Sequence, residues 1–390
     1  MGTRGNVENE TQSPSEIWRG NFFAKRADKI EMTAVTDLTR PNKTVVRNSS
    51  LELLRITGMF MIIIFHSILH GVSRFPSGII TVNKLWYQFL LMQGAIGNNI
   101  FVLISGYFLI KSPGINFSKL FNLWIKAVFY LLAVLALSVS FGLHAFSFEG
   151  LTECFMPITK GPWWFVSIYF LMYLLHPYLN MFLCSLSRDE YKKFLLAAGL
   201  YFSIFLLITD SDVGYSQLAM FICVYSFAGY IRLWADDFGS RKYILFGIAL
   251  MLVNLLSAAV LDILHPKYPA ALRNSVYFFY GKHGAQLGMM RPLNILSALC
   301  MLIGFKKLDL PFSKRINFIA SATLGVYMIH DNLFSTHFFW FRLFKFPLFK
   351  EKPYFVPYSV ICVAGVYFYC VLVELARSDI FRRISRGRFS

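Results

Sequence analysis

The sequence predicts an all-α, polytopic membrane protein, a bundle of about ten transmembrane helices with both termini in the cytoplasm. Two features predict this fold class. Hydrophobic residues make up 56% of the 390-residue chain and charged residues only 15%, whereas a soluble domain has about 25% charged residues. In addition, apolar stretches of about 20 residues, the length that spans the hydrocarbon core of a bilayer, recur along the chain.

Three regions are expected. Residues 1–50 are polar and lack apolar periodicity, which predicts a disordered cytoplasmic tail, and residues 379–390 form a short basic cytoplasmic tail. Residues 51–378 form the transmembrane domain. Its predicted spans lie at about 53–70, 87–110, 121–142, 163–184, 194–209, 215–231, 243–262, 287–305, 317–335 and 355–376.

The distribution of basic residues predicts the orientation. If the N-terminus is inside, the inner loops and both tails carry 25 Lys and Arg residues and the outer loops carry 10, four of them within 341–353. Because cytoplasmic loops are enriched in these residues, the chain is expected to be N-in and C-in. The net charge of +17 is therefore attributed to membrane topology, with a lipid bilayer and not nucleic acid as the partner.

The first predicted span carries two ionisable groups on one face. Arg55 and His66 are eleven residues apart, about three helical turns and roughly 16 Å along the axis, and Glu52 extends the same stripe. Arg55 at a helix end can simply snorkel to the surface, and His66 can simply pack or hydrogen-bond. A polar residue near mid-membrane is costly, however, and a neutral histidine on a cavity wall suits a general base.

Three further segments carry polar or aromatic groups within spans. Residues 94–110 hold small side chains that favour close helix packing, together with Asn98 and Asn99. Residues 161–180 place Trp163 and Trp164 either in an interfacial aromatic belt or at a sugar site. His330 lies in the predicted span 317–335, where it either serves function or contacts His66 directly. Its neighbour Asp331 is not on the same helical face.

Other site chemistries are not indicated. His66 and His70 are separated by four residues, but no third ligand is suggested nearby, so no metal site is expected. The six cysteines form no CxxC motif and are expected to be buried thiols. No HExxH, GxSxG, Walker or GxGxxG motif is present.

Five segments together resemble the membrane acyltransferase-three family, the integral-membrane O-acyltransferases of bacterial surface polysaccharides, and in particular its Gram-positive, capsule-type branch. The resemblance covers about residues 50–378. The segments are LELLRITGMFMIIIFH (51–66), with the family's Arg-x10-His, GAIGNNIFVLISGYFLIK (94–111), LFNLWIKAVFY (120–130), GPWWFVSIYFLMYLLHPYLN (161–180) and SATLGVYMIHDN (321–332).

This resemblance implies a multi-pass protein of the bacterial plasma membrane that transfers an acyl group, by default acetyl, from cytoplasmic acetyl-CoA. The acceptor would be a hydroxyl of a surface polysaccharide or lipid-linked glycan, and no cofactor would be bound. The implied catalytic residues are Glu52, Arg55 and His66. The implied donor-binding residues are Arg55, Ser105, Tyr107, Lys111, Lys119 and Lys126. The implied acceptor-binding residues are Asn99, Trp163, Trp164, Tyr169 and His330.

A mechanism consistent with the spacing uses His66 to take a proton from the sugar hydroxyl and Arg55 to hold a phosphate or carbonyl of the donor. Two alternatives stay open. A transporter or flippase of lipid-linked sugars would line a path with the same polar residues without chemistry. A polytopic glycosyltransferase would normally need a large outer loop with acidic or arginine-rich motifs, and the longest predicted outer loop, 263–286, has only Asp262 at its edge.

Overall fold

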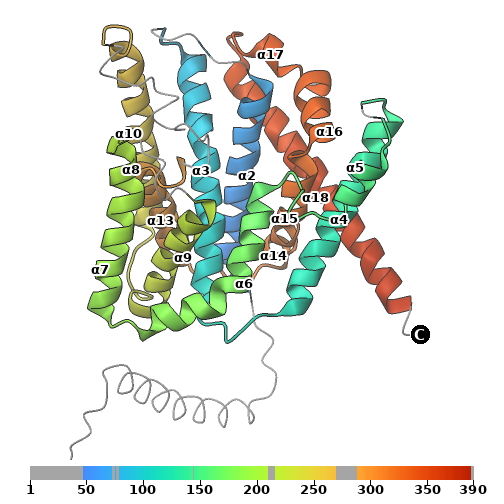
Figure 1. Cartoon of the computed structure of the whole chain (residues 1–390). Helices are drawn as coiled ribbons and strands as arrows, with labels where there is room; N and C mark the ends of the chain where they lie inside the picture. Colours follow the sequence, from blue (N-terminus) through green and yellow to red (C-terminus); the bar gives the residue numbers. More distant parts are fainter. Residues whose placement is uncertain are drawn as a thin grey trace, which may run out of the picture. The chain divides into compact units, whose positions relative to one another are not determined.

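A computed structural model shows how the predicted spans are arranged (Figure 1). It describes residues 47–72, 75, 79–143, 145–209, 216–268 and 288–387. The predicted disordered tail therefore lies outside the described residues, apart from its last four positions, as does most of the predicted outer loop at 263–286. No strand occurs in the part of the chain that the structure describes, so the all-α prediction is confirmed.

Eight helical segments among the described residues are long and apolar enough to cross a membrane. The segment Arg188–Ile208 combines α7 (Arg188–Gly199), the π-helix η1 (Leu200–Phe205) and most of α8 (Leu206–Thr209). The other seven are α2 (Ser49–Gly71), α3 (Val82–Leu109), α4 (Phe117–Ser140), α6 (Trp164–Ser185), α9 (Gln217–Trp234), α10 (Lys242–Leu264) and α18 (Phe355–Gly387).

The two remaining predicted spans take other forms. The eighth is α13 (Pro292–Lys306), which has only 15 residues. The ninth was expected to be continuous over 317–335, which is wrong: α14 (Lys314–Ser321), α15 (Thr323–His330) and α16 (Leu333–Thr336) replace it. The break after α15 has a local cause, because the Asn332 side chain accepts a hydrogen bond from the Ser335 backbone N–H and so starts a new helix.

Helices α2 and α3 pack against each other at the centre of the bundle (Figure 1). Glycines make this possible: a Cβ atom at Gly97 would lie 2.8 Å from the carbonyl oxygen of Gly58, and one at Gly94 would lie 2.4 Å from the Phe65 ring. The helix-packing interpretation of the small residues in 94–110 is therefore confirmed. The close approach of α3 therefore fixes the position of α2, the helix that carries His66.

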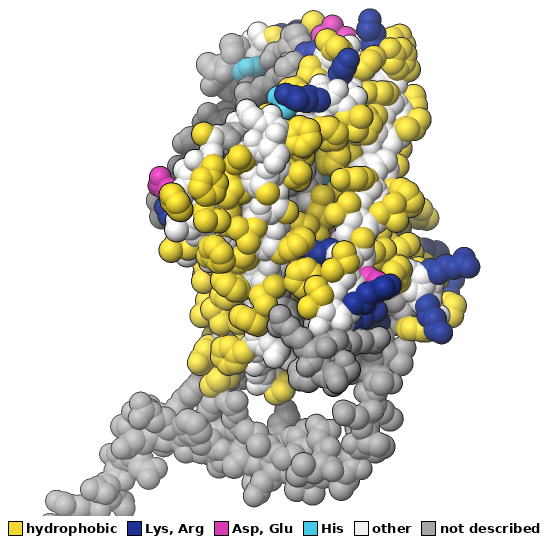
Figure 2. Space-filling model, turned by 90° about the vertical axis from the view of Figure 1, so that its right-hand side faces the viewer, with side chains coloured by type: hydrophobic (Ala, Val, Ile, Leu, Met, Phe, Trp, Pro, Cys, Tyr) yellow, Lys and Arg dark blue, Asp and Glu magenta, His cyan; other side chains and the backbone are white. Residues whose placement is uncertain are grey.

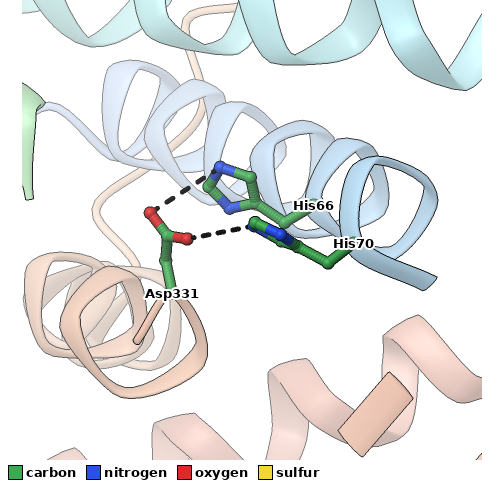
Figure 3. Close-up of side chains that lie close together, drawn as sticks. All are labelled: His66, His70 and Asp331. Carbon is green, nitrogen blue, oxygen red and sulfur yellow. Dashed lines mark ion pairs between the residues drawn. The ribbon is translucent and has the colours of Figure 1, made fainter. Parts of the chain in front are cut away.

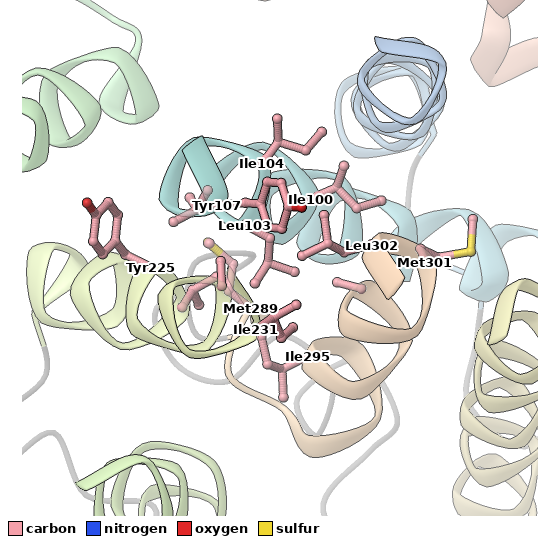
Figure 4. Packing of buried hydrophobic residues seen from close by; sticks show 14 of the residues in the cluster. Ile100, Leu103, Ile104, Tyr107, Tyr225, Ile231, Met289, Ile295, Met301 and Leu302 are labelled. Atoms are coloured by element: carbon pink, nitrogen blue, oxygen red, sulfur yellow. The ribbon is translucent and has the colours of Figure 1, made fainter. Parts of the chain in front are cut away.

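Two hydrophobic clusters flank this pair. One joins α3 to α9 and α13 through residues such as Ile100, Leu103 and Leu302 (Figure 4). The other joins α2 to α6, α15 and α18. Figure 2 shows an apolar outer surface along α18 and its neighbours, with Lys and Arg side chains collected towards the ends of the bundle. This distribution is that of a multi-pass membrane protein.

Helix α18 continues beyond the predicted span 355–376. It stays helical to Gly387, so most of the predicted basic tail at 379–390 belongs to the same helix. The last turns of α18 extend past the apolar bundle (Figure 1). They carry an exposed ion pair between Arg383 and Asp379.

Candidate active site

The polar stripe of α2 begins at an ion pair. Asn48 caps the helix by accepting hydrogen bonds from the backbone N–H groups of Ser50 and Leu51. One turn later the Arg55 guanidinium donates a hydrogen bond to the Glu52 carboxylate at 2.6 Å. The Arg55 side chain is 26% exposed and the Glu52 side chain 8% exposed. Glu52 therefore orients Arg55, which keeps part of its guanidinium accessible at this end of the bundle.

His66 lies in the second half of α2, five residues before its end at Gly71. Residue 60 is the midpoint of the helix, so His66 is displaced from it by about 9 Å at 1.5 Å per residue. The imidazole is buried, with 7% of the residue exposed.

A hydrogen-bond chain defines the proton positions on His66. Nδ1 of His330 lies 2.7 Å from the carbonyl oxygen of Val326, which can only accept, so this nitrogen carries a proton. In a neutral imidazole the other nitrogen of His330, Nε2, then accepts, and it lies 2.9 Å from Nδ1 of His66. His66 therefore donates through Nδ1 and keeps the lone pair on Nε2.

The Nε2 atom of His66 faces a carboxylate (Figure 3). Asp331 Oδ2 lies 3.7 Å from it, and Asp331 Oδ1 lies 3.5 Å from Nε2 of His70, one turn further along α2. The indole N–H of Trp163 donates to the Asp331 backbone carbonyl at 2.7 Å and anchors this residue. Because α15 ends at His330, the backbone turns and both His330 and Asp331 reach α2.

Three aromatic rings connect His66 with the region of Arg55. The Tyr327 ring lies 6.4 Å from the His66 ring, and the Phe165 ring lies 6.1 Å from Tyr327. Tyr169 stacks parallel to Phe165 at 6.5 Å, and its hydroxyl interacts with Ser105 and with the charge of Arg55. The stripe on α2 is thus accompanied by an aromatic wall contributed by α15 and α6.

The predicted donor-binding lysines occupy different environments. Lys111 and Lys119 are exposed near the α3–α4 connection, at the end of the bundle where α2 begins. Lys126 lies within α4 and pairs with Glu374 of α18 at 2.7 Å. Glu374 also accepts from Arg377 at 2.8 Å, so Lys126 belongs to a buried ion network between α4 and α18. The donor-binding role predicted for Lys126 stays a prediction, and the charge that it would offer is paired with Glu374.

Tyr107 is also committed to another network. Its hydroxyl donates to Asp236 at 2.5 Å and accepts from Arg232 at 2.9 Å. Burial raises the pKa of Asp236, but Tyr107, Arg232 and Lys306 together lower it below its ordinary value, so the side chain is a carboxylate. This network joins α3, α9 and α13, and Tyr107 is correspondingly 6% exposed.

Three of the predicted acceptor-binding residues have no surface to offer an acceptor. Trp163, His330 and Asn99 are each 0% exposed. Trp163 is buried with its indole N–H held by the Asp331 carbonyl, and His330 is the direct partner of His66. Asn99 donates to the Met289 carbonyl at 2.7 Å and ties α3 to the segment before α13. Trp164 packs edge-on against Phe221 and stays partly exposed.

Sequence reasoning did not find the pairing of Asp331 with His66, nor the positions of Tyr327 and Phe165. The signal for Asp331 was the sequence His-Asp-Asn, in which asparagine is a common first residue of a new helix. Two cavities, of about 490 and 560 Å³, lie beside α13, and none of their lining residues belongs to the stripe on α2.

The fold and this cluster define a multi-pass helical membrane protein that holds a buried histidine pair beside a carboxylate. A family model described as an acyltransferase domain matches residues 48–374, and the chain therefore belongs to the acyltransferase-three family. The resemblance to this family is confirmed, and the protein is a membrane acyltransferase. No curated protein and no solved structure gave a significant match.

Proposed function

We propose that this protein is an O-acyltransferase that moves an acetyl group from acetyl-CoA to a hydroxyl of a cell-surface or lipid-linked polysaccharide. With the expected N-in orientation, Arg55 faces the cytoplasm and His66 lies towards the outer side. The donor would then enter beside Arg55, and the acceptor would approach from the side of His66.

One observation carries this proposal: the hydrogen-bond chain from Val326 through His330 leaves the lone pair of His66 on Nε2. A base that is neutral, oriented and buried can remove a proton from a hydroxyl, which is worth about 10²–10⁴-fold in rate. The nearby Asp331 carboxylate stabilises the imidazolium that forms.

The transfer step follows from this arrangement. The acceptor hydroxyl gives its proton to His66 Nε2 as its oxygen attacks the thioester carbonyl carbon. The carbon–sulfur bond then breaks, and the imidazolium returns the proton to the departing coenzyme A thiolate. The products are an ester on the glycan and free coenzyme A, with His66 neutral again.

Arg55 and the aromatic wall suit the donor. A guanidinium held by Glu52 binds a phosphate or carbonyl oxygen of acetyl-CoA as a charge-assisted donor. The roughly 16 Å between Arg55 and His66 fits an extended pantetheine arm. Tyr169, Phe165 and Tyr327 would cover the apolar part of that arm along its length.

The proposal is tested with purified protein in lipid nanodiscs, acetyl-CoA labelled in its acetyl group, and a polysaccharide fraction from the source cell envelope. Transfer should produce free coenzyme A and a labelled glycan that loses its label in mild alkali, as an ester does. Arg55→Lys should raise the KM for acetyl-CoA, because a point charge replaces a bidentate fork. A transporter of lipid-linked sugars would release no coenzyme A, which would refute the proposal.

A further inference from the structure

His66, His70 and Asp331 bring three metal-binding atoms together. One ligand atom from each of His66, His70 and Asp331, a ring nitrogen or a carboxylate oxygen, lies within 4.8 Å of the other two (Figure 3). Zn²⁺ binds nitrogen and oxygen at about 2.0–2.2 Å, which places tetrahedral ligands about 3.3 Å apart. Nε2 of His66 lies 3.7 Å from Oδ2 of Asp331 and Nε2 of His70 lies 3.5 Å from Oδ1, so each histidine is near that value from one of the two carboxylate oxygens.

The proton positions on His66 also suit a metal. The residue donates through Nδ1 to His330 and leaves the Nε2 lone pair towards Asp331. Metal-ligating histidines commonly donate their second ring nitrogen in this way, which fixes the orientation of the ring. His66 and His70 lie one helical turn apart on one face of α2, a spacing that zinc sites use.

The charge around Asp331 favours a cation. Among the residues that the structure describes, its ion-pair partners are only His66 and His70, and no lysine or arginine pairs with it. A largely buried carboxylate whose ion-pair partners in the described chain are two imidazoles, without a lysine or arginine, is a favourable place for a cation. His70 is 32% exposed and Asp331 17%, so a hydrated ion can reach the three ligands from that side.

We infer that His66, His70 and Asp331 form a binding site for a divalent transition-metal ion of the Zn²⁺ type, with the fourth position open to water. Metal binding occupies the Nε2 lone pair and therefore competes with acyl transfer. This competition rests on the proposed role of His66, whereas the binding itself does not. The ion acts as a reversible inhibitor at the acceptor side of the site.

Binding is measured on protein purified without a polyhistidine tag and treated with EDTA. Co²⁺ added to the wild type should give visible absorption bands with one equivalent bound, and Zn²⁺ should displace it. His70→Ala should weaken binding at least about tenfold, and Asp331→Asn should weaken it similarly. The control is His337→Ala, which removes an exposed histidine outside the cluster and should bind as the wild type does.

Absence of Co²⁺ and Zn²⁺ binding by the wild type, or equal binding by His70→Ala, would overturn the site, whether or not the protein transfers acetyl groups. Inhibition is measured as coenzyme A release. Zn²⁺ should inhibit the wild type reversibly, whereas the activity that His70→Ala retains should resist Zn²⁺. Loss of wild-type activity in EDTA, restored by Zn²⁺, would overturn the competition and make zinc a required ion.

Discussion

Replacing His330 with leucine tests the role of the histidine pair. The substitution keeps an apolar side chain in a position that is 0% exposed and removes the acceptor that lies 2.9 Å from Nδ1 of His66. An unpaired buried donor costs about 1–3 kcal/mol. The His66 proton can avoid this cost by moving to Nε2, where Asp331 lies 3.7 Å away. That tautomer has no lone pair for the acceptor hydroxyl.

A shift of about 1–3 kcal/mol between tautomers lowers the active fraction of His66 by about 5- to 150-fold, since about 1.4 kcal/mol is tenfold. His330→Leu should therefore lower the kcat for coenzyme A release by one to two orders of magnitude. The KM for acetyl-CoA should stay near the wild-type value, because Arg55 is roughly 16 Å along α2 from His66, the residue whose tautomer changes.

The matched variant is His330→Gln, whose amide oxygen can reach the position of the lost acceptor. It should recover a large part of the kcat that His330→Leu loses. Steady-state kinetics of both variants test whether His330 sets the tautomer of His66, and thermal melting compares the stability of the variants. If the two variants are equally impaired, or if KM changes and kcat does not, then His330 does not set the tautomer of His66.

Three further changes test other parts of the structure. Asp331→Asn removes a negative charge that stabilises the His66 imidazolium by up to about 4 kcal/mol at an effective dielectric of 20. Single-turnover acyl transfer should therefore slow by up to about a thousandfold, and an unchanged rate would exclude stabilisation of the imidazolium by Asp331. Glu374→Gln breaks a buried ion network and should lower stability by about 3 kcal/mol in thermal melting, whereas Asp379→Asn on the same helix should have little effect. Gly94→Ala places a methyl group 2.4 Å from the Phe65 ring and should lower the free energy of unfolding by about 1–3 kcal/mol. Gly114→Ala, whose added methyl group meets no atom within 4 Å, should leave stability unchanged. Equal melting temperatures of the two variants would contradict the close packing of α2 and α3.

Much of the fold could be predicted because membrane helices have a strong sequence signal. Apolar stretches of bilayer length located most spans, and Gly94 and Gly97 indicated where two helices meet. The break after His330 was missed because the residues around it are apolar enough to continue a span. The side-chain capping by Asn332 decides the break, and hydropathy does not register it.

The candidate site was predicted in part. The spacing of Arg55 and His66 follows from helix geometry alone, so their common face could be expected. The partners of His66 come from α15, more than 250 positions away in the sequence, and only folding places them there. The anchoring of Asp331 by the Trp163 indole N–H could not be expected either, because the two residues are 168 positions apart in the sequence.

The central claim is that Nε2 of His66 accepts the proton of the acceptor hydroxyl. The most direct test is the single-turnover rate of coenzyme A release by wild type and His66→Ala in nanodiscs, with acetyl-CoA binding measured on the same samples. Equal donor binding with a rate reduced by about 10²–10⁴-fold in His66→Ala is the predicted result. Release at the wild-type rate by a fully bound His66→Ala variant would contradict the claim.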